Sequence, residues 1–300
     1  MRYLELLIDR SRELSQNTRY DANSGVSQRV FTQFFQNAQD FIVREIINSK
    51  SKYFILPVVV PVVSGQEPYA YPSDIMLQGI DTIEWSDNLK TWLFLEKNIT
   101  KDRTTSVSGY PYGYWLNRSY INLTPPLQGG YLRITYNKRP KRLEKRSALV
   151  VSTTGSPITS ITIDPAYTGT DPTYLSQFQF ISIVGKDGVV KVSAIPITTV
   201  TTTTITVPSY ALQTGEAIAA GDYVLADKNT ANIPDYDDIC ESFLILHSTY
   251  QAKYGDSSTW SKEVAADVGV HAKQIIALFA TLSEDVSHIP IVNTDFLALW

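Results

Sequence analysis

Residues 27–63, SQRVFTQFFQNAQDFIVREIINSKSKYFILPVVVPVV, contain the change of hydrophobic period that decides the fold class. In the first half, apolar residues recur at the spacing of one helix face: Val30, Phe34, Ala38, Phe41, Ile42 and Ile46. Ser27 is a suitable N-cap for this helix, which we expect to extend to about Asn48. From Tyr53 the residues are β-branched and interrupted by prolines, which favours an edge strand or a strand pair with bends. A helix followed by strands indicates an α+β chain.

Helical periodicity occurs again at both ends of the chain. Apolar spacing predicts a helix over residues 2–15, before a polar loop. After Ile233-Pro234, Asp235 can cap a helix that ends near Gly255, and a further helix is expected from about 257 to 282. Residues 286–300 contain Pro290 and have no helical face. We expect them to form an extended, apolar C-terminal arm.

The middle of the chain is strand-like. We expect short strands, separated by turn signals, at residues 75–85, 92–96, 112–116, 120–123 and 131–137. From about residue 147 the composition shifts to Thr, Val, Ile, Ser and Gly with little charge. Strands are predicted there at residues 158–163, 178–184, 189–195, 202–207 and 222–225. Lys186-Asp187-Gly188 indicates a hairpin turn, and the threonine run 198–204 a half-exposed strand.

These elements predict an α+β fold in which two helix pairs, distant in sequence, form a discontinuous helical bundle with a small β region. Residues 1–146 and 231–285 are expected to form this core. Residues 147–230 are expected to form an inserted all-β domain, similar to a sandwich or barrel. Residues 286–300 are the extended C-terminal arm.

Composition limits the classes of function. A formal net charge of −4 and a pI near 5.5 argue against a protein whose main task is to bind nucleic acid. The single cysteine, Cys240, excludes an intrachain disulfide and a cysteine-based zinc site, and its apolar surroundings favour a buried small hydrophobe. The N-terminus lacks signal-peptide features and no apolar run could span a bilayer, so we expect no membrane partner.

A search for catalytic patterns gives a negative expectation. His247, His271 and His288 have no metal-ligand spacing, and we expect the first two to be partly exposed helix residues. Motifs of metalloproteases, α/β-hydrolases and phosphate-binding loops are absent. Asp237 and Glu241 lie four residues apart, but acidic residues at a helix start are what the helix dipole favours. We therefore predict no catalytic residue, no metal, no cofactor and no enzymatic activity.

A basic segment closes the first strand region, with Lys138, Arg139, Lys141, Arg142, Lys145 and Arg146. One interpretation is a solvated linker into the inserted domain. The other is a patch that faces an acidic protein surface or DNA in a channel. Nearby, Trp92, Tyr110, Tyr112, Tyr114, Trp115 and Tyr120 form an aromatic-rich zone, which fits a core or a subunit interface better than a sugar-binding surface.

Several motifs, in order, resemble the head-to-tail adaptor (head-completion) proteins of tailed phages, including the tail tubular protein A type of podophages. They are FQNAQ at 35–39, YAYPSDI at 69–75, GYPYGY at 109–114, INLTPP at 121–126, LRITY at 132–136 with Arg139-Pro140, and IPDYDD at 233–238. The stretch 147–230 departs from this pattern, because compact members of the family have only a short connection there.

The resemblance implies a structural virion protein at the head-tail junction, assembled in the host cytoplasm and used in genome ejection. It implies a self-assembled ring, commonly of twelve copies, that connects the portal protein to the tail nozzle protein, lines or seals the DNA exit channel and contacts packaged DNA transiently. It also implies that the arm binds the portal. The sequence agrees, because a free tail would expose too much apolar area at Ile289, Ile291, Phe296, Leu297, Leu299 and Trp300.

Two alternatives from other functional classes remain. Some tail-associated adaptors degrade peptidoglycan, which would make the chain an enzyme. The inserted β domain and the aromatic residues could instead form a receptor- or carbohydrate-binding tail module. For the insertion itself we expect contact with a neighbouring virion protein, such as a tail fibre, the nozzle or the capsid.

Overall fold

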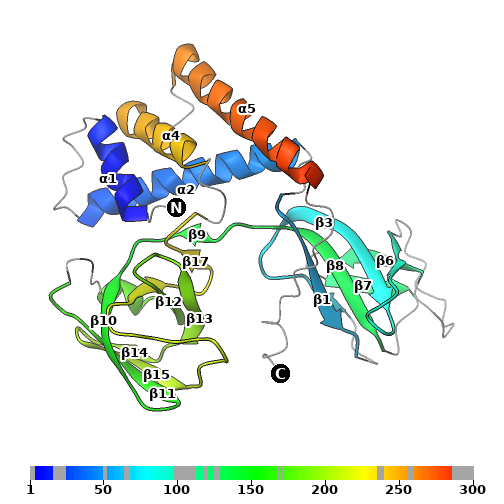
Figure 1. Ribbon diagram of the computed structural model, residues 1–300, viewed down its shortest axis with the longest axis horizontal. Coiled ribbons are helices and arrows are strands. Elements are labelled where there is room, and N and C mark those ends of the chain that lie inside the picture. The colour runs from blue at the N-terminus through cyan, green and yellow to red at the C-terminus, as the bar shows by residue number, and fades with distance from the viewer. Residues whose placement is uncertain are drawn as a thin grey trace. The chain divides into compact units, whose positions relative to one another are not determined.

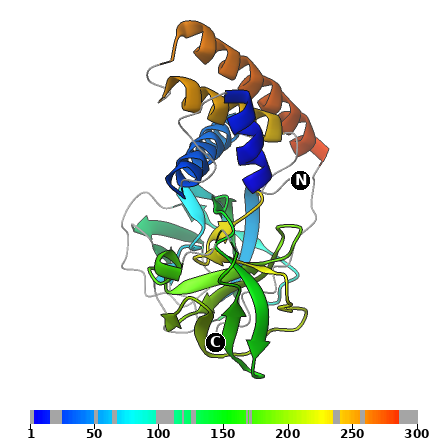
Figure 2. The same cartoon turned by 90° about the vertical axis from the view of Figure 1, so that its left-hand side faces the viewer.

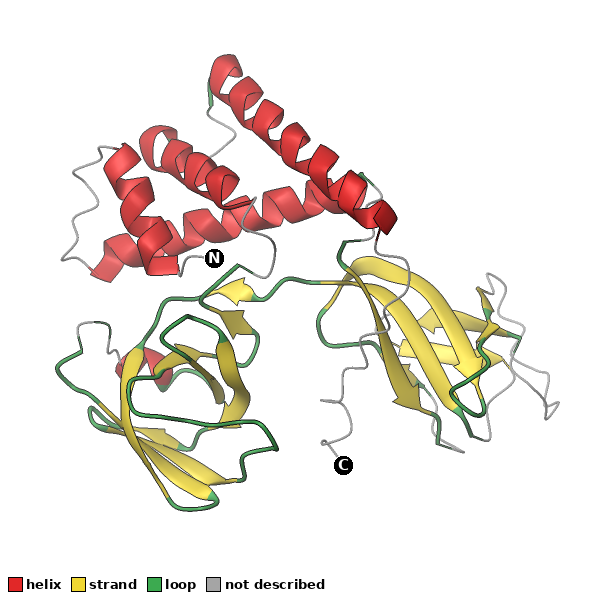
Figure 3. Cartoon of the chain, viewed as in Figure 1, coloured by secondary structure: helices red, strands yellow, loops and turns green. Residues whose placement is uncertain are grey.

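A computed structural model describes residues 4–15, 25–49, 53–63, 68–97, 112–117, 120–124, 129–167, 169, 172–234, 240–255 and 260–285. Helices and antiparallel sheets alternate along the chain, which confirms the α+β class (Figures 1 and 3). The chain divides into two compact units. Unit 1 comprises Met1–Glu45 and Pro140–Ile276, and unit 2 comprises Ile46–Arg139 and Ala277–Trp300.

The helices are α1 (Leu4–Ser15), α2 (Gly25–Asn48), α4 (Glu241–Tyr254) and α5 (Lys262–Asp285). In unit 1, α1 packs against α4, where Ser11 Oγ lies 3.1 Å from Thr249 Oγ1 (Figure 2). Phe41 on α2 stacks on Phe243 of α4, with ring centroids 5.8 Å apart. Helices from both ends of the sequence therefore pack together, whereas the complete bundle stays a prediction. None of the helices described has the length and apolar character needed to cross a membrane.

The sequence predicted N-caps for two of these helices, α2 and α4. Helix α2 begins at Gly25, so Ser27 lies inside the helix and the prediction that it is the N-cap was wrong. Helix ends can shift by one or two residues without changing the apolar face, so the sequence alone places the first residue of a helix only approximately. Helix α4 begins at Glu241, and Asp235 and Asp237 lie outside the described residues.

The β part of unit 1 is a seven-stranded sheet in the order β13-β12-β16-β10-β11-β15-β14. Its strands are β10 (Ala148–Thr154), β11 (Ile158–Ile163), β12 (Phe180–Val184), β13 (Val190–Pro196), β14 (Thr199–Val200), β15 (Thr204–Tyr210) and β16 (Tyr223–Ala226); a short helix, α3 (Pro172–Leu175), lies between β11 and β12. Alternate residues face one apolar core, and β13 lies close to β15, so the sheet curls round on itself. Strand β10 was missing from the predicted set.

The threonine run forms a hairpin rather than the single strand that we expected. Val200 on β14 pairs with Ile205 on β15, and the Thr201 N–H donates to Thr204 O at 2.8 Å. Threonine suits both a strand and a short polar turn, so composition did not locate the reversal. The predicted turn at Lys186-Asp187-Gly188 is confirmed between β12 and β13, with Gly188 at φ 83°.

Unit 2 contains two four-stranded sheets, β1-β8-β3-β4 and β2-β7-β6-β5. The strands are β1 (Ile55–Pro61), β2 (Tyr69–Ala70), β3 (Ile75–Ser86), β4 (Leu93–Phe94), β5 (Glu96–Lys97), β6 (Gly113–Asn117), β7 (Tyr120–Thr124) and β8 (Tyr131–Lys138). Side chains from both sheets share one core, including Ile83, Trp85 and Leu132 from the first and Ile121 from the second. The strand predicted at 92–96 is two strands, one in each sheet, joined at the buried Leu95.

Strand β1 is an edge strand, as predicted, because it pairs with β8 alone. Phe54 O accepts from the Lys138 N–H and the Val62 N–H donates to Gly130 O, so even-numbered residues of this stretch bond to the β8 side. Pro57 and Pro61 have the opposite parity. Their missing N–H groups therefore face the open edge, where the ladder needs no donor.

Candidate functional site at the β9–β17 joint

Two short parallel strands carry the chain into and out of the seven-stranded sheet. They are β9 (Arg142–Leu143) and β17 (Thr230–Ala231), and we call them with their hydrogen-bonded neighbours the joint. The Arg142 N–H donates to Asn229 O at 3.0 Å, and the Glu144 N–H donates to Ala231 O at 2.9 Å. The crossing segments of unit 1 are thus held to each other by backbone bonds.

Two glutamines of α2 fasten strand β9. Gln36 Oε1 accepts from the Leu143 N–H at 2.9 Å, and Gln39 Nε2 donates to Lys141 O at 2.9 Å. On the same helix, Phe35 and Ala38 are buried. These four residues belong to the FQNAQ motif that carried the resemblance. The structure therefore gives that motif a physical role, namely to position the start of the β sheet on the helix.

The first turn of α1 ties both crossing segments together. The Glu5 carboxylate accepts from the Arg146 N–H at 2.7 Å and from Asn232 Nδ2 at 3.0 Å. The Leu4 N–H donates to Asn232 O at 2.9 Å, and Asn232 Nδ2 also donates to Glu144 O at 3.1 Å. Asn232 is fully buried. Neither Glu5 nor Asn232 belonged to a predicted site, because each resembles an ordinary surface residue in sequence.

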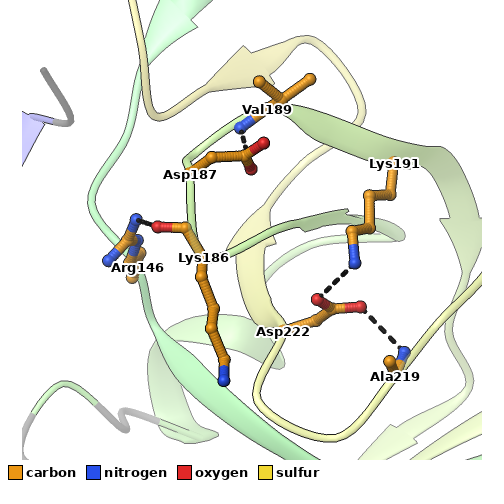
Figure 4. A network of polar contacts seen from close by, with 7 residues as sticks. All are labelled: Arg146, Lys186, Asp187, Val189, Lys191, Ala219 and Asp222. Carbon is orange, nitrogen blue, oxygen red and sulfur yellow. Dashed lines mark hydrogen bonds and ion pairs between the residues drawn. The ribbon is translucent and has the colours of Figure 1, made fainter. Parts of the chain in front are cut away.

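Arg146 fixes the joint to the β12–β13 hairpin. Arg146 is 8% exposed, and its guanidinium lies 4.2 Å over the Tyr223 ring. Its Nη2 donates to Lys186 O at 2.9 Å (Figure 4). Beyond the hairpin, the buried Asp222 accepts from Lys191 Nζ at 2.7 Å and, through its other oxygen, from the Ala219 N–H. Arg146 therefore links α1 to the β12–β13 hairpin, and Asp222 makes a separate set of polar contacts within the sheet.

Glu144 is the buried carboxyl group of the joint. It is 6% exposed, and Oε2 accepts from the Tyr174 hydroxyl at 3.2 Å. Burial raises the pKa of Glu144, against the opposing effects of the Arg142 charge and the Tyr174 hydrogen bond. Its neighbours are side chains and backbone of the joint, which supports a structural role for the carboxyl group.

The predicted basic segment is spread over different environments. Arg139 and Arg142 are exposed, Lys138, Lys141 and Lys145 are half-buried, and Arg146 is buried. The segment includes β9 and the buried Leu143, so its interpretation as a solvated linker was wrong. Hydrophobic anchors between the cations, together with the α2 glutamines, order it. A contact of the five outer cations with a partner stays a prediction.

His247 differs most from expectation. It is 3% exposed, and the Phe41, Phe243 and Trp260 rings surround it at centroid distances of 5.6, 5.6 and 5.0 Å. The prediction of a partly exposed side chain was wrong, because α4 has aromatic neighbours on this side. Burial lowers the pKa of His247 to about 4. His271 lies half-exposed on α5, as predicted, and His288 lies outside the described residues.

The remaining predicted residues divide between the core, the surface and the undescribed part of the chain. Cys240 and Tyr114 are buried, and Tyr112 and Tyr120 are exposed. Tyr110 and the six arm residues Ile289, Ile291, Phe296, Leu297, Leu299 and Trp300 lie outside the described residues. Within the described ranges, no group of three or more His, Cys, Asp or Glu side chains could hold a metal ion.

Two further motifs meet in unit 2. The Tyr136 hydroxyl, from LRITY, donates to Asp74 Oδ1 of YAYPSDI at 2.8 Å, and the Arg139 N–H donates to Asp74 O. Burial, followed by the hydrogen bond to Asp74 and its charge, raises the pKa of Tyr136. Residues that are far apart in the sequence thus form a second structural cluster.

The model of the family described as SU10 adaptor protein matches residues 1–168, which include α1, α2, the sheets of unit 2 and strand β9. No curated protein matches the chain.

Proposed function

The chain belongs to the SU10 adaptor protein family, and from this premise we propose that it forms an oligomeric ring between the portal of the capsid and the tail. Membership indicates a structural component of a phage virion that links head and tail. The proposal adds the ring, of about twelve copies, and a channel that the ring lines or seals for DNA exit during genome ejection. Assembly takes place in the host cytoplasm.

The family match carries this proposal, and the joint supports it. The match covers more than half of the 300 residues, and the motif residues Gln36 and Gln39 inside it hold strand β9. A ring subunit must keep its interfaces in fixed positions, which favours buried polar contacts over a flexible linker. The Glu5 carboxylate and the Asn232 Nδ2 group bond to other groups of the joint, which is the arrangement of a structural component.

The partners follow from the surfaces and the arm. Residues 286–300 bind the portal protein in this proposal, because burial of their apolar side chains could contribute several kcal/mol at about 25 cal/mol/Å² before ordering costs. The ring joins the tail nozzle protein, in the manner of the podophage adaptors. The β domain of unit 1, residues 147–230, contacts a tail fibre or the capsid. Lys138, Arg139, Lys141, Arg142 and Lys145 contact packaged DNA or an acidic partner surface.

Deletion of the arm tests the portal contact. The 1–285 chain should keep the circular dichroism spectrum and thermal midpoint of the full chain, and it should lose co-sedimentation with the portal. Serine at Phe296, Leu299 and Trp300 should have the same effect, whereas serine at the polar Asn293 and Thr294 should not. Normal portal binding by the 1–285 chain would refute the role of the arm.

The non-enzymatic part of the proposal has its own test. A zymogram of the purified chain on peptidoglycan should show no clearing. Clearing that disappears when an Asp or Glu is neutralised would replace the structural function with the enzymatic one.

A further inference from the structure

Four neighbouring strands of the seven-stranded sheet are built from sequence without charge. Residues 147–163 and 192–215 contain no Asp, Glu, Lys or Arg. These two stretches supply β10, β11, β15 and β14, which are consecutive in the sheet (Figure 1). The strands therefore offer no cation to a phosphate backbone and no formal charge of either sign to an oppositely charged protein surface.

Strand pairing arranges the outer side chains of these strands in two rows. The first row crosses four strands, and its members pair in the order Thr154, Ser160, Thr206 and Thr199. The second row crosses three strands, in the order Ser152, Thr162 and Thr204. The row between them contains Ile161 and Ile205 of the buried core, so the seven hydroxyl side chains lie on the opposite, solvent side. We call these seven residues the hydroxyl face.

The hydroxyl groups of this face are available to a ligand. Neighbouring threonines use theirs within the chain, since Thr159 donates to Thr154 O at 3.3 Å and Thr198 donates to Thr206 O at 3.2 Å. None of the seven side chains of the hydroxyl face is hydrogen-bonded to another residue in the described part of the chain, and none of them is buried. Each free hydroxyl can both donate and accept a hydrogen bond.

The spacing of the hydroxyl face is regular and fixed. Adjacent strands lie about 4.8 Å apart, so each row presents hydroxyls at intervals close to the length of one sugar residue in an extended polysaccharide. The second row lies two residues further along the strands, about 7 Å away. The fully buried Ile161 and Ile205 support the face from below. Its hydroxyls are therefore held in position before a ligand binds, which lowers the entropy that binding loses.

We propose that the hydroxyl face binds a neutral, extended polysaccharide of the host cell surface, which lies across the strands. Sugar hydroxyls are uncharged and both donate and accept hydrogen bonds, as the side chains of this face do. A protein interface needs an apolar centre and DNA needs cations, and the two rows supply neither. Binding by one copy is weak, because single hydrogen bonds add little in water. Repeated copies in the proposed ring would strengthen it, and only this avidity rests on the proposed function.

Affinity electrophoresis of the full chain tests this binding. Native gels contain hydroxyethylcellulose as a neutral, extended polysaccharide, dextran as a neutral, flexible one, or no polysaccharide. The chain should be retarded by hydroxyethylcellulose relative to a marker protein of similar size, and less by dextran. Added salt should not reduce the retardation, because no charge takes part. Equal relative mobility with and without hydroxyethylcellulose would overturn the proposal.

Two matched double variants locate the binding site. Thr154→Val with Thr206→Val removes two free hydroxyls at nearly constant volume and should weaken binding by about tenfold. Thr159→Val with Thr198→Val removes hydroxyls that are bonded to backbone oxygens, and should leave binding unchanged. Equal effects of the two double variants would overturn the site. Thr199→Val, on the short strand β14, should weaken binding by about threefold and gives a readout if the first double variant is unstable.

Electron micrographs of the same variants mixed with the portal separate this inference from the proposed function. The variant with Thr154→Val and Thr206→Val should form rings as the wild-type chain does. Rings without retardation of the wild-type chain would overturn the polysaccharide site alone, and retardation without rings would overturn the ring proposal alone. Loss of rings in this variant, with rings retained in the matched control, would show that the hydroxyl face contacts a protein and would overturn the polysaccharide site.

Discussion

Asn232 donates a hydrogen bond from Nδ2 to the carboxylate of Glu5, at 3.0 Å to one oxygen and 3.2 Å to the other. The pair joins the first turn of α1 to the segment that leaves the seven-stranded sheet. Glu5 also accepts from the Arg146 N–H, so one side chain holds both sides of the joint. The joint is thus built from groups that cannot be replaced singly without leaving a buried partner unsatisfied.

Removal of either member of this pair should destabilise unit 1. Asn232→Ala should lower the free energy of unfolding by about 2–3 kcal/mol, because it leaves the Glu5 carboxylate without its amide partner. Urea denaturation measures the change. Gln33→Ala, at an exposed position of α2, should stay within about 0.5 kcal/mol. A double-mutant cycle with Glu5→Ala should give a coupling energy above about 1 kcal/mol, and strict additivity would contradict the account.

Two arginines of the basic segment should respond differently. Arg146→Ala should lower the free energy of unfolding by about 2–3 kcal/mol. The substitution removes the contact with Tyr223 and the hydrogen bond to Lys186 O from a buried site. Arg142→Ala should cost under about 0.5 kcal/mol, because its side chain is exposed and its backbone bond is unaffected. Chemical denaturation of both variants measures the two changes in the free energy of unfolding. Equal losses of unfolding free energy in the two variants would mean that the segment is not anchored through Arg146.

Adjacent glycines before β8 provide a matched pair. Gly130 has φ 97°, and a Cβ there would lie 2.6 Å from both Ser86 O and Trp85 Nε1, whereas a Cβ on Gly129 would meet nothing within 4 Å. Gly130→Ala should therefore destabilise unit 2 by more than about 2 kcal/mol and change the Trp85 environment, and Gly129→Ala should be close to neutral. Thermal denaturation, monitored by tryptophan fluorescence, measures the midpoint of each variant. Similar midpoints for the Gly130 and Gly129 variants would show that this turn is not constrained.

His247 should make the fold sensitive to acid. Burial lowers its pKa from the usual 6.5 to about 4, so the unfolded chain binds a proton in this range before the folded chain does. The resulting stability is complete above pH 6.5 and is lost as the pH falls towards 4, with a total of about 3 kcal/mol.

The substitution His247→Leu should flatten the stability profile between pH 6.5 and 4. His271→Ala, at a half-exposed position, should leave that profile unchanged. Comparison of variants also removes the contribution of Glu144, whose raised pKa acts in the opposite direction by favouring the folded state at low pH. A profile that is the same with and without His247 would rule out its titration as the cause.

The periodic parts of this fold could be predicted from the sequence. The helical spacing from Val30 to Ile46 matches α2, and the β-branched run at 55–61 matches an edge strand, because local patterns reflect which face is buried. The ends of the individual strands were harder to predict. Hydrogen bonds to distant partners decide where β4 ends and β5 begins, and Leu95 between them gives no local signal of the change of sheet.

The joint could not be predicted in the same way. Glu5, Gln36, Glu144 and Asn232 come from four distant parts of the chain, and polar residues of these types are usually exposed. Only the FQNAQ motif gave a signal, and it came from the family resemblance rather than from periodicity. His247 was placed wrongly for a related reason, since the aromatic rings around it belong to α2, α4 and the segment before α5.

Electron cryomicroscopy of the full chain mixed with its portal tests the central claim most directly. The account predicts closed rings of about twelve copies docked on the portal, with density for residues 286–300 on the portal surface. Monomers that remain free of the portal at saturating concentration would contradict it.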